Sequence, residues 1–130
     1  MQLSRLSHVF LNVYDIERSR RFYADLLGFE ILEEDPEHGG TFLQLPGGGH
    51  SLDLQQIEAD APPPQGTFIR GGLGVAHVAF HVDTQEQLRD AYFELQDAGV
   101  PIINALDHKS QQSVYFLDPD GIEYEVVSYC

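Results

Sequence analysis

The feature that most constrains this chain is an internal repeat. The stretch "HVFLNVYDIERSRRFYADLLGFEI", from His8, aligns with "HVAFHVDTQEQLRDAYFELQDAGVPI", from His77. Each copy opens with a histidine and an apolar-rich strand, then continues into a helix with an apolar stripe. Asp15 and Thr84, each seven residues after the histidine, are the expected helix caps, and Thr84 forms a capping box with Gln87. Each helix is expected to end at a glycine, Gly28 or Gly99, which is the residue most typical of that position. The self-similarity predicts two copies of one supersecondary unit.

Three strand-like runs follow each helix, and clusters of glycine, proline and aspartate separate them as turns. The runs are "FEILEE", "TFLQLP" and "SLDLQQI" in the first half, and "PIINAL", "SVYFL" and "IEYEVVSY" in the second. The predicted order is therefore β-α-β-β-β twice, an α+β fold. We expect one domain over 1–130, with module one at about 5–57, a linker at about 58–74 and module two at about 75–130.

The charge balance restricts the partners of this chain. Its 130 residues carry 7 basic and 21 acidic side chains, a formal net charge of −14. Such a surface repels phosphate, so we expect no nucleic-acid partner and no anionic membrane partner. The N-terminus lacks a signal-peptide core, and the single cysteine, Cys130, has no internal partner for a disulfide. We therefore expect a cytoplasmic protein.

Strand alternation separates an aliphatic set from a histidine set in the first strand of each half. The histidine sets, which we expect to face away from the helices, are His8, Phe10 and Asn12 in the first half and His77, Ala79 and His81 in the second. Overlaying the halves pairs His8 with His77 and Asp53 with Glu125. A lone strand-end histidine is more often a hydrogen-bonded core residue. The repeated set of imidazoles and carboxylates instead suits a divalent transition metal.

With these residues in view, the chain resembles the vicinal oxygen chelate superfamily. That group contains glyoxalase I, extradiol dioxygenases, methylmalonyl-CoA epimerase, and the fosfomycin and bleomycin resistance proteins. The resemblance covers essentially the whole chain and rests on the duplication, on "SHVFLNV" and "AHVAFHV", and on "DPDGIEYE". It implies the glyoxalase/bleomycin resistance/dioxygenase fold, in which two βαβββ modules form a cupped mixed sheet with the helices on its outer face.

The resemblance also implies a metal site. The family's Asp-Pro-Asp-Gly motif is followed by three residues and then by a metal-binding glutamate, and that count lands on Glu125 rather than Glu123. The family's two histidine ligands fall on His8 and His77, with Asp53 as a candidate fourth ligand. The implied cofactor is one divalent metal ion, with Fe(II) favoured and Mn, Ni, Co or Zn as alternatives. The implied partners are a small-molecule substrate with vicinal oxygens and a second copy of the chain, as a homodimer.

The stretch "DHKSQQSVYF" favours the extradiol dioxygenase branch, in which a catechol-type ring is cleaved with O2. It resembles the part of those enzymes that carries a histidine close to the site but not bound to the metal, and a tyrosine near the substrate hydroxyl, here His108 and Tyr115. By this resemblance Tyr115 hydrogen-bonds the substrate and His108 assists it. The side chains of Phe10, Asn12 and His81 are expected to line the substrate pocket.

Two alternatives remain open at this point. Those dioxygenases usually have a further acid/base histidine in the first module, yet regular alternation places His50 on the opposite face from Asp53, unless a bulge after "PGGG" reverses it. If Asp53 binds the metal, a glyoxalase I-like or epimerase-like lyase or isomerase is favoured, with Asp53 or Glu125 as general base. The second alternative is a metal-independent protein that binds a drug in the cup.

Overall fold

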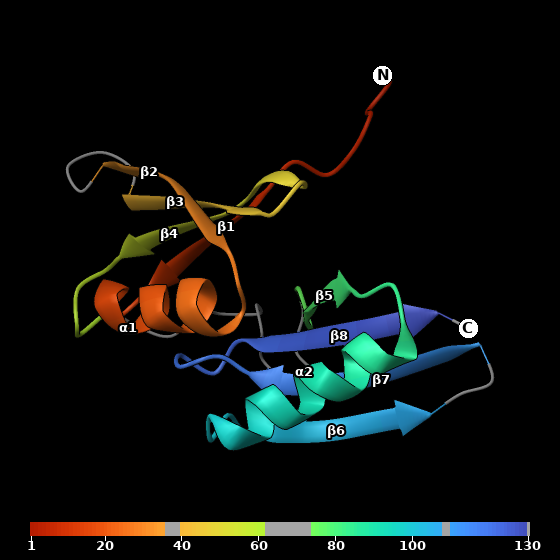
Figure 1. The fold of residues 1–130 in the computed structure, drawn as a ribbon. Coiled ribbons are helices and arrows are strands. Elements are labelled where there is room, and N and C mark those ends of the chain that lie inside the picture. The colour runs from red at the N-terminus through yellow and green to blue at the C-terminus, as the bar shows by residue number, and fades with distance from the viewer. Residues whose placement is uncertain (36–39, 62–73, 108–109, 130) are drawn as a thin grey trace. The chain divides into compact units, whose positions relative to one another are not determined.

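The computed structural model describes residues 1–35, 40–61, 74–107 and 110–129, which form two compact units, Met1–Ala61 and Pro62–Cys130 (Figure 1). The first unit contains β1 (Val9–Val13), α1 (Ile16–Arg20), η1 (Arg21–Leu26), β2 (Glu30–Asp35), β3 (Gly40–Leu45) and β4 (Gly49–Gln56). The second contains β5 (Val78–His81), α2 (Gln85–Asp97), β6 (Ile102–Asp107), β7 (Gln111–Leu117) and β8 (Glu123–Tyr129). Most of the predicted linker, 62–73, lies outside the described residues. Within the described ranges, no helix has the length and apolarity needed to cross a bilayer.

Each unit is built on a four-stranded mixed sheet. The strand orders are β1-β4-β3-β2 and β5-β8-β7-β6, with β1 parallel to β4 and β5 parallel to β8. The other neighbouring strands are antiparallel. The predicted fold of two βαβββ modules is confirmed. A parallel pairing needs a crossover, so the first strand of each module lies beside the last strand rather than beside its neighbour in sequence.

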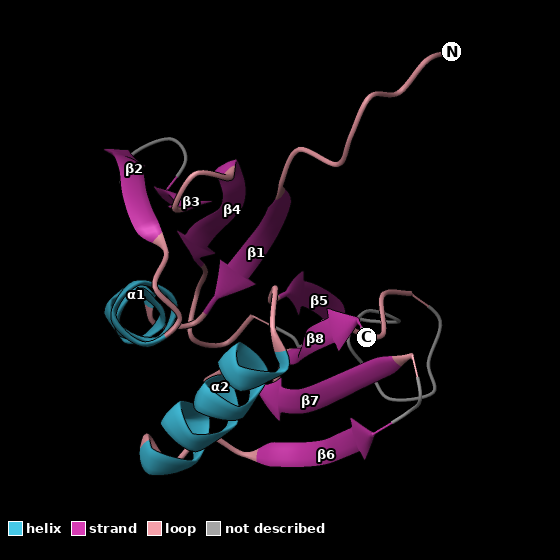
Figure 2. Cartoon of the chain, turned by 45° about the vertical axis from the view of Figure 1, so that its right-hand side comes forward, coloured by secondary structure: helices cyan, strands magenta, loops and turns pink. Residues whose placement is uncertain are grey.

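The aliphatic strand sets form the cores, as alternation predicts. Leu11 and Val13 are buried in the first unit, while Phe10 and Asn12 on the other face are exposed. In the second unit, α2 lies across β7 and β8 and buries Leu88 and Leu95 (Figure 2). The core side chains contributed by those two strands include Val114, Phe116, Tyr124 and Val126. Thr84 and Gln87 form the predicted capping box at the start of α2.

The first helix differs from its predicted form. Asp15 caps α1 as expected, but the winding widens into the π-helical segment η1 after one turn and a half. The backbone N–H of Leu27 then bonds the carbonyl of Phe22, at 3.0 Å. The wider turn buries Phe22 and the adjacent Tyr23 together, and their rings meet edge to face at 5.1 Å. The i→i+5 hydrogen bond of a π turn changes the spacing of the buried positions from the 3.6-residue period of a regular helix.

The turn "DPDG" fixes the start of β8. The buried carboxylate of Asp118 accepts hydrogen bonds from the backbone N–H groups of Asp120 and Ile122, at 2.9 and 2.8 Å. The backbone of Asp118 also pairs with Ile122. Gly121 takes the left-handed conformation that the reversal requires, with φ at +86°. The turn therefore sets which residues of β8 point to each face.

Gly40, at the start of β3, offers a test of the packing between β3 and β4. Its φ is +81°, and an added Cβ would lie 2.0 Å from the backbone carbonyl oxygen of Leu54. Gly47 has a similar φ of +74° but open space around it. We expect Gly40→Ala to lower the free energy of unfolding by about 3 kcal/mol or more, from backbone strain plus the clash. The matched Gly47→Ala should cost only about 1 kcal/mol, from strain alone. Urea denaturation measures both, and equal losses would contradict the close contact with β4.

Candidate metal and substrate site

In the first unit, two imidazoles converge on one buried carboxylate. Asp53 is 5% exposed, and its two oxygens face different histidines. His8 Nε2 lies 3.5 Å from Asp53 Oδ2, and His50 Nε2 contacts Oδ1. The ligand atoms of the three residues all lie within 4.8 Å of one another. The three side chains therefore form a group that could hold a metal ion.

The position of His50 is a correction to regular strand alternation. Residues three apart on a regular strand face opposite sides, which would turn His50 away from Asp53. The ladder between β3 and β4 shifts between Leu43 and Gln44, so that Leu43 pairs with Leu52 and Gln44 pairs with His50. Ser51 is therefore the extra residue of a β-bulge, and the bulge turns His50 onto the face that Asp53 occupies.

The two histidines of the first unit are oriented by their neighbours. Their rings stack with centroids 4.5 Å apart and an interplanar angle of 11°. His8 Nδ1 lies 3.0 Å from Ser7 Oγ, which leaves Nε2 to face Asp53. The ring of Phe42 flanks His50 at 5.7 Å. Hydrogen bonding at one ring nitrogen commonly fixes which nitrogen of a metal-binding histidine is available.

The chemistry of this donor set fits a divalent transition metal. Neutral imidazoles suit Fe, Ni, Cu and Zn, and one carboxylate offsets part of the ion's charge. A buried carboxylate is also costly unless it is paired, and its ion-pair partners within the described residues are the two imidazoles. Either protonated histidines or a bound cation meets that requirement.

In the second unit, the buried carboxylate is that of Glu125, which is 5% exposed. Its Oε2 accepts a hydrogen bond from Ser113 Oγ at 2.5 Å and another from Gln111 Nε2 at 3.2 Å. Its Oε1 lies 3.0 Å from His77 Nε2. The Gln111 amide also donates to Ser113 Oγ, at 3.1 Å. Both donors come from β7, and they leave Oε1 directed at the imidazole.

The two glutamates of β8 approach His77 from different sides. Glu125 is next to Nε2, whereas Glu123 Oε2 lies 3.6 Å from Nδ1. The two carboxylates therefore differ in role as well as in burial. Glu125 and the Nε2 nitrogen can bind the same metal ion, whereas Glu123 lies near the other ring nitrogen, beyond hydrogen-bond distance.

Tyr115 stands directly across the ladder from Glu125. Its ring meets His77 edge to face at 5.4 Å, and its phenol hydrogen-bonds the Glu125 carboxylate. Burial raises the pKa of Tyr115 above its usual value of 10.0, and the negative charge of Glu125 and that hydrogen bond raise it further. The phenol is therefore a proton donor that stays protonated at neutral pH.

The repeat predicted from sequence is visible in the strand registers. Phe10, two residues after His8, pairs with Asp53, and Ala79, two residues after His77, pairs with Glu125. His50 and Glu123 also occupy equivalent places, because each lies two ladder pairs before the buried carboxylate of its own strand. Each half thus presents a histidine, a buried carboxylate and a third ionisable side chain.

Three of the remaining sequence-predicted residues, Phe10, Asn12 and His81, are not among the ionisable side chains of these clusters. Phe10 and Asn12 are exposed on the face that carries His8. His81 is exposed, stacks on Tyr129 at 5.7 Å and lies 3.7 Å from Asp83. His108 lies outside the described residues. Sequence reasoning did not single out Ser113 or Gln111, although each lies at an alternate strand position from Tyr115, as residues of one face do.

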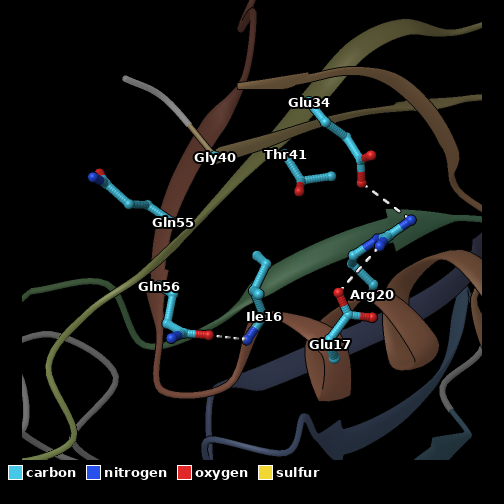
Figure 3. A pocket seen from close by; sticks show the side chains of 8 residues that line it. All are labelled: Ile16, Glu17, Arg20, Glu34, Gly40, Thr41, Gln55 and Gln56. Carbon is cyan, nitrogen blue, oxygen red and sulfur yellow. Dashed lines mark hydrogen bonds and ion pairs between the residues drawn. The ribbon is translucent and has the colours of Figure 1, made fainter. Parts of the chain in front are cut away.

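A pocket of about 390 Å³ lies in the first unit, and none of its lining residues is a candidate metal ligand (Figure 3). Its lining residues are Ile16, Glu17, Arg20, Glu34, Gly40, Thr41, Gln55 and Gln56. The Arg20 guanidinium points between two carboxylates, 3.2 Å from Glu17 and 3.1 Å from Glu34. The cation is already paired twice, so this pocket has no free positive charge to offer an anion.

The sequence of this chain matches a known protein family and several of its members. Residues 5–126 match the model of the Glyoxalase/Bleomycin resistance protein/Dioxygenase superfamily. Biphenyl-2,3-diol 1,2-dioxygenase 3 of Rhodococcus globerulus is 31% identical over 119 residues, covering 90% of this chain but 59% of that protein. The chain thus spans less than two thirds of that relative. Metallothiol transferase FosB of Staphylococcus saprophyticus is 32% identical over 126 residues, covering 95% and 76%.

A solved structure agrees with the fold. The glyoxalase/dioxygenase of Nostoc punctiforme superposes with a TM-score of 0.79 at 26% identity, covering 97% of this chain and 91% of that one. Relatives with different names therefore share one architecture, and the fold alone does not select among their activities.

The Tyr115 phenol provides a test of its contact with Glu125 in the second unit. In the metal-free protein, we expect Tyr115 to ionise above its usual pKa of 10.0, and Glu125→Gln to lower that pKa by removing a negative charge. A raised folded-state pKa means that the folded state holds its proton more tightly than the unfolded state. The contribution of Tyr115 to stability is therefore complete below about pH 10 and is lost above it. NMR of ring-labelled tyrosine measures the titration, with Tyr115→Phe identifying the signal. A pKa unchanged by Glu125→Gln would contradict the contact.

Proposed function

Because this chain belongs to the Glyoxalase/Bleomycin resistance protein/Dioxygenase superfamily, we propose that it is a metal-dependent enzyme that cleaves the ring of a catechol-type substrate with O2. The observation that carries the proposal is Tyr115, whose phenol stands across from Glu125 and beside His77. The similarity to a biphenyl-diol dioxygenase supports the same reaction class.

The proposed metal ligands are His8, His77 and Glu125, with Asp53 as a candidate fourth. They come from different units, which belong either to one chain or to the two chains of a homodimer. Two imidazoles and one carboxylate form a set typical of non-haem Fe(II) oxygenases, with Mn, Ni, Co or Zn as alternatives. A divalent metal bound there supplies Lewis-acid chemistry and a template for two adjacent oxygens of the substrate.

The protein side chains then have separate tasks. Ser113 and Gln111 hold Glu125 through Oε2, so that Oε1 stays available. Tyr115 keeps its proton at neutral pH and donates a hydrogen bond to a substrate hydroxyl oxygen. The exposed side chains of Phe10, Asn12 and His81 are proposed to line the substrate pocket, and His108 is proposed to assist Tyr115.

A lyase or isomerase is the second candidate, and Asp53 is the observation that favours it. Its buried carboxylate faces His8, so it is placed to add a fourth protein ligand. More protein ligands leave fewer open positions for both a diol and O2, and a carboxylate beside the metal suits proton abstraction next to a carbonyl. Activity with Ni, Co or Zn but not with iron would favour this candidate.

The two glutamates of β8 give a direct test of the ligand assignment. We expect Glu125→Gln to lower the affinity for Fe(II) by at least about 100-fold, because it removes the charged ligand. Glu123→Gln should weaken binding by only about tenfold, because Glu123 contacts the far nitrogen of His77. Anaerobic Fe(II) titration measures both variants. The reverse order would place the metal two residues earlier on β8.

Oxygen consumption tests the reaction itself. After anaerobic loading with Fe(II), we expect O2 uptake with at least one member of a panel of catechols. Tyr115→Phe should lower kcat by about 10²-fold, because it removes a positioned proton donor. No uptake on any diol by iron-loaded protein would overturn the dioxygenase proposal. A drug-binding protein without metal would instead keep ligand affinity in His8→Ala and Glu125→Ala.

A further inference from the structure

We propose that the first unit binds a divalent transition-metal ion by itself, through His8, His50 and Asp53, without His77 or Glu125. The inference rests on the proposed function in one respect, since His8 is a metal ligand in both. It goes further by adding His50 as a ligand and by making one unit sufficient for capture of the ion.

Convergence of the donor atoms is the first argument. Both imidazoles direct Nε2 at the same carboxylate, and each meets a different oxygen of Asp53. The near-parallel stack of the rings sets those nitrogens side by side. The distances among the ligand atoms, all under 4.8 Å, are short enough for one ion to contact all three. A set of two imidazoles and one carboxylate also matches a divalent first-row metal better than Ca²⁺ or Mg²⁺, which prefer oxygen ligands.

The second unit provides an internal contrast. Its histidine, His77, lies between two carboxylates, with Nδ1 toward Glu123 and Nε2 toward Glu125. A ring cannot direct both nitrogens at one ion, so these three side chains do not converge as those of the first unit do. The bulge at Ser51 provides the difference, because it puts an imidazole where the second unit has Glu123.

A metal-free explanation competes with this one. A protonated His50 can form a hydrogen-bonded ion pair with Asp53, and that pair alone meets the cost of burying the carboxylate. The position of Ser7 argues for the metal, because it occupies Nδ1 of His8 and leaves Nε2 with the buried carboxylate as its neighbour. Two imidazoles turned to one carboxylate exceed what a single ion pair requires.

The experiment removes the second-unit ligands from the full chain. In His77→Ala/Glu125→Gln, we expect Co(II) to bind stoichiometrically and to give ligand-field absorption bands. Adding His50→Gln to this background should abolish the bands, whereas adding His38→Ala, which removes an imidazole that belongs to neither ligand set, should leave them unchanged. Circular dichroism checks that each variant is folded. As a measurement independent of the triple variant, Zn(II) added to the double variant should shift the ring ¹⁵N signals of His8 and His50 but not that of His81.

The outcomes separate this inference from the proposed function. Loss of Co(II) from the folded double variant, while the wild type binds it, would overturn the inference and leave the proposed function standing. Retained Co(II) that is insensitive to His50→Gln would overturn it as well, because the ligand set would be wrong. Retained binding that His50 controls supports the inference even if no catechol is cleaved. A wild type that binds no Co(II), Fe(II) or Zn(II) would overturn both.

Discussion

The burial of two carboxylates, Asp53 and Glu125, is the constraint on which the rest of the site depends. A charged group removed from water must be neutralised or paired, and each of these lies at an equivalent place on the last strand of its unit. The parallel pairing brings the start of the first strand beside that position, which delivers His8 and His77. The topology thus provides the partner that the buried charge requires.

The two halves meet the same requirement with different chemistry. In the second unit, Ser113 and Gln111 donate hydrogen bonds to one oxygen of Glu125 and a single imidazole faces the other. In the first unit, imidazoles face both oxygens of Asp53. A duplicated backbone therefore supports one half that positions its carboxylate through hydroxyl and amide donors and another half that gathers nitrogen ligands around it. Divergence of this kind is how one fold comes to serve many reactions.

Much of this could be predicted from the sequence, for identifiable reasons. Gly28 and Gly99, the Thr84 capping box and the "DPDG" turn are local signals, and the structure follows them. The place of Asp53 and Glu125 on the ladder follows from alternation once the halves are overlaid. For His50, the sequence offers two faces, according to whether a bulge follows "PGGG", and alternation alone cannot decide between them. The π-helical winding is equally invisible, since it depends on how Phe22 and Tyr23 pack in the finished core.

The bulge at Ser51 also affects how related sequences should be compared. An ungapped alignment of the two halves sets Ser51 against Glu123 and His50 against Ile122, although the ladders make His50 and Glu123 equivalent. A search for ligand residues at alternate strand positions would pass over this histidine for the same reason. In relatives of this chain, a gain or loss of one residue near the start of the last strand of the first half can therefore exchange one candidate ligand for another with no substitution at the site.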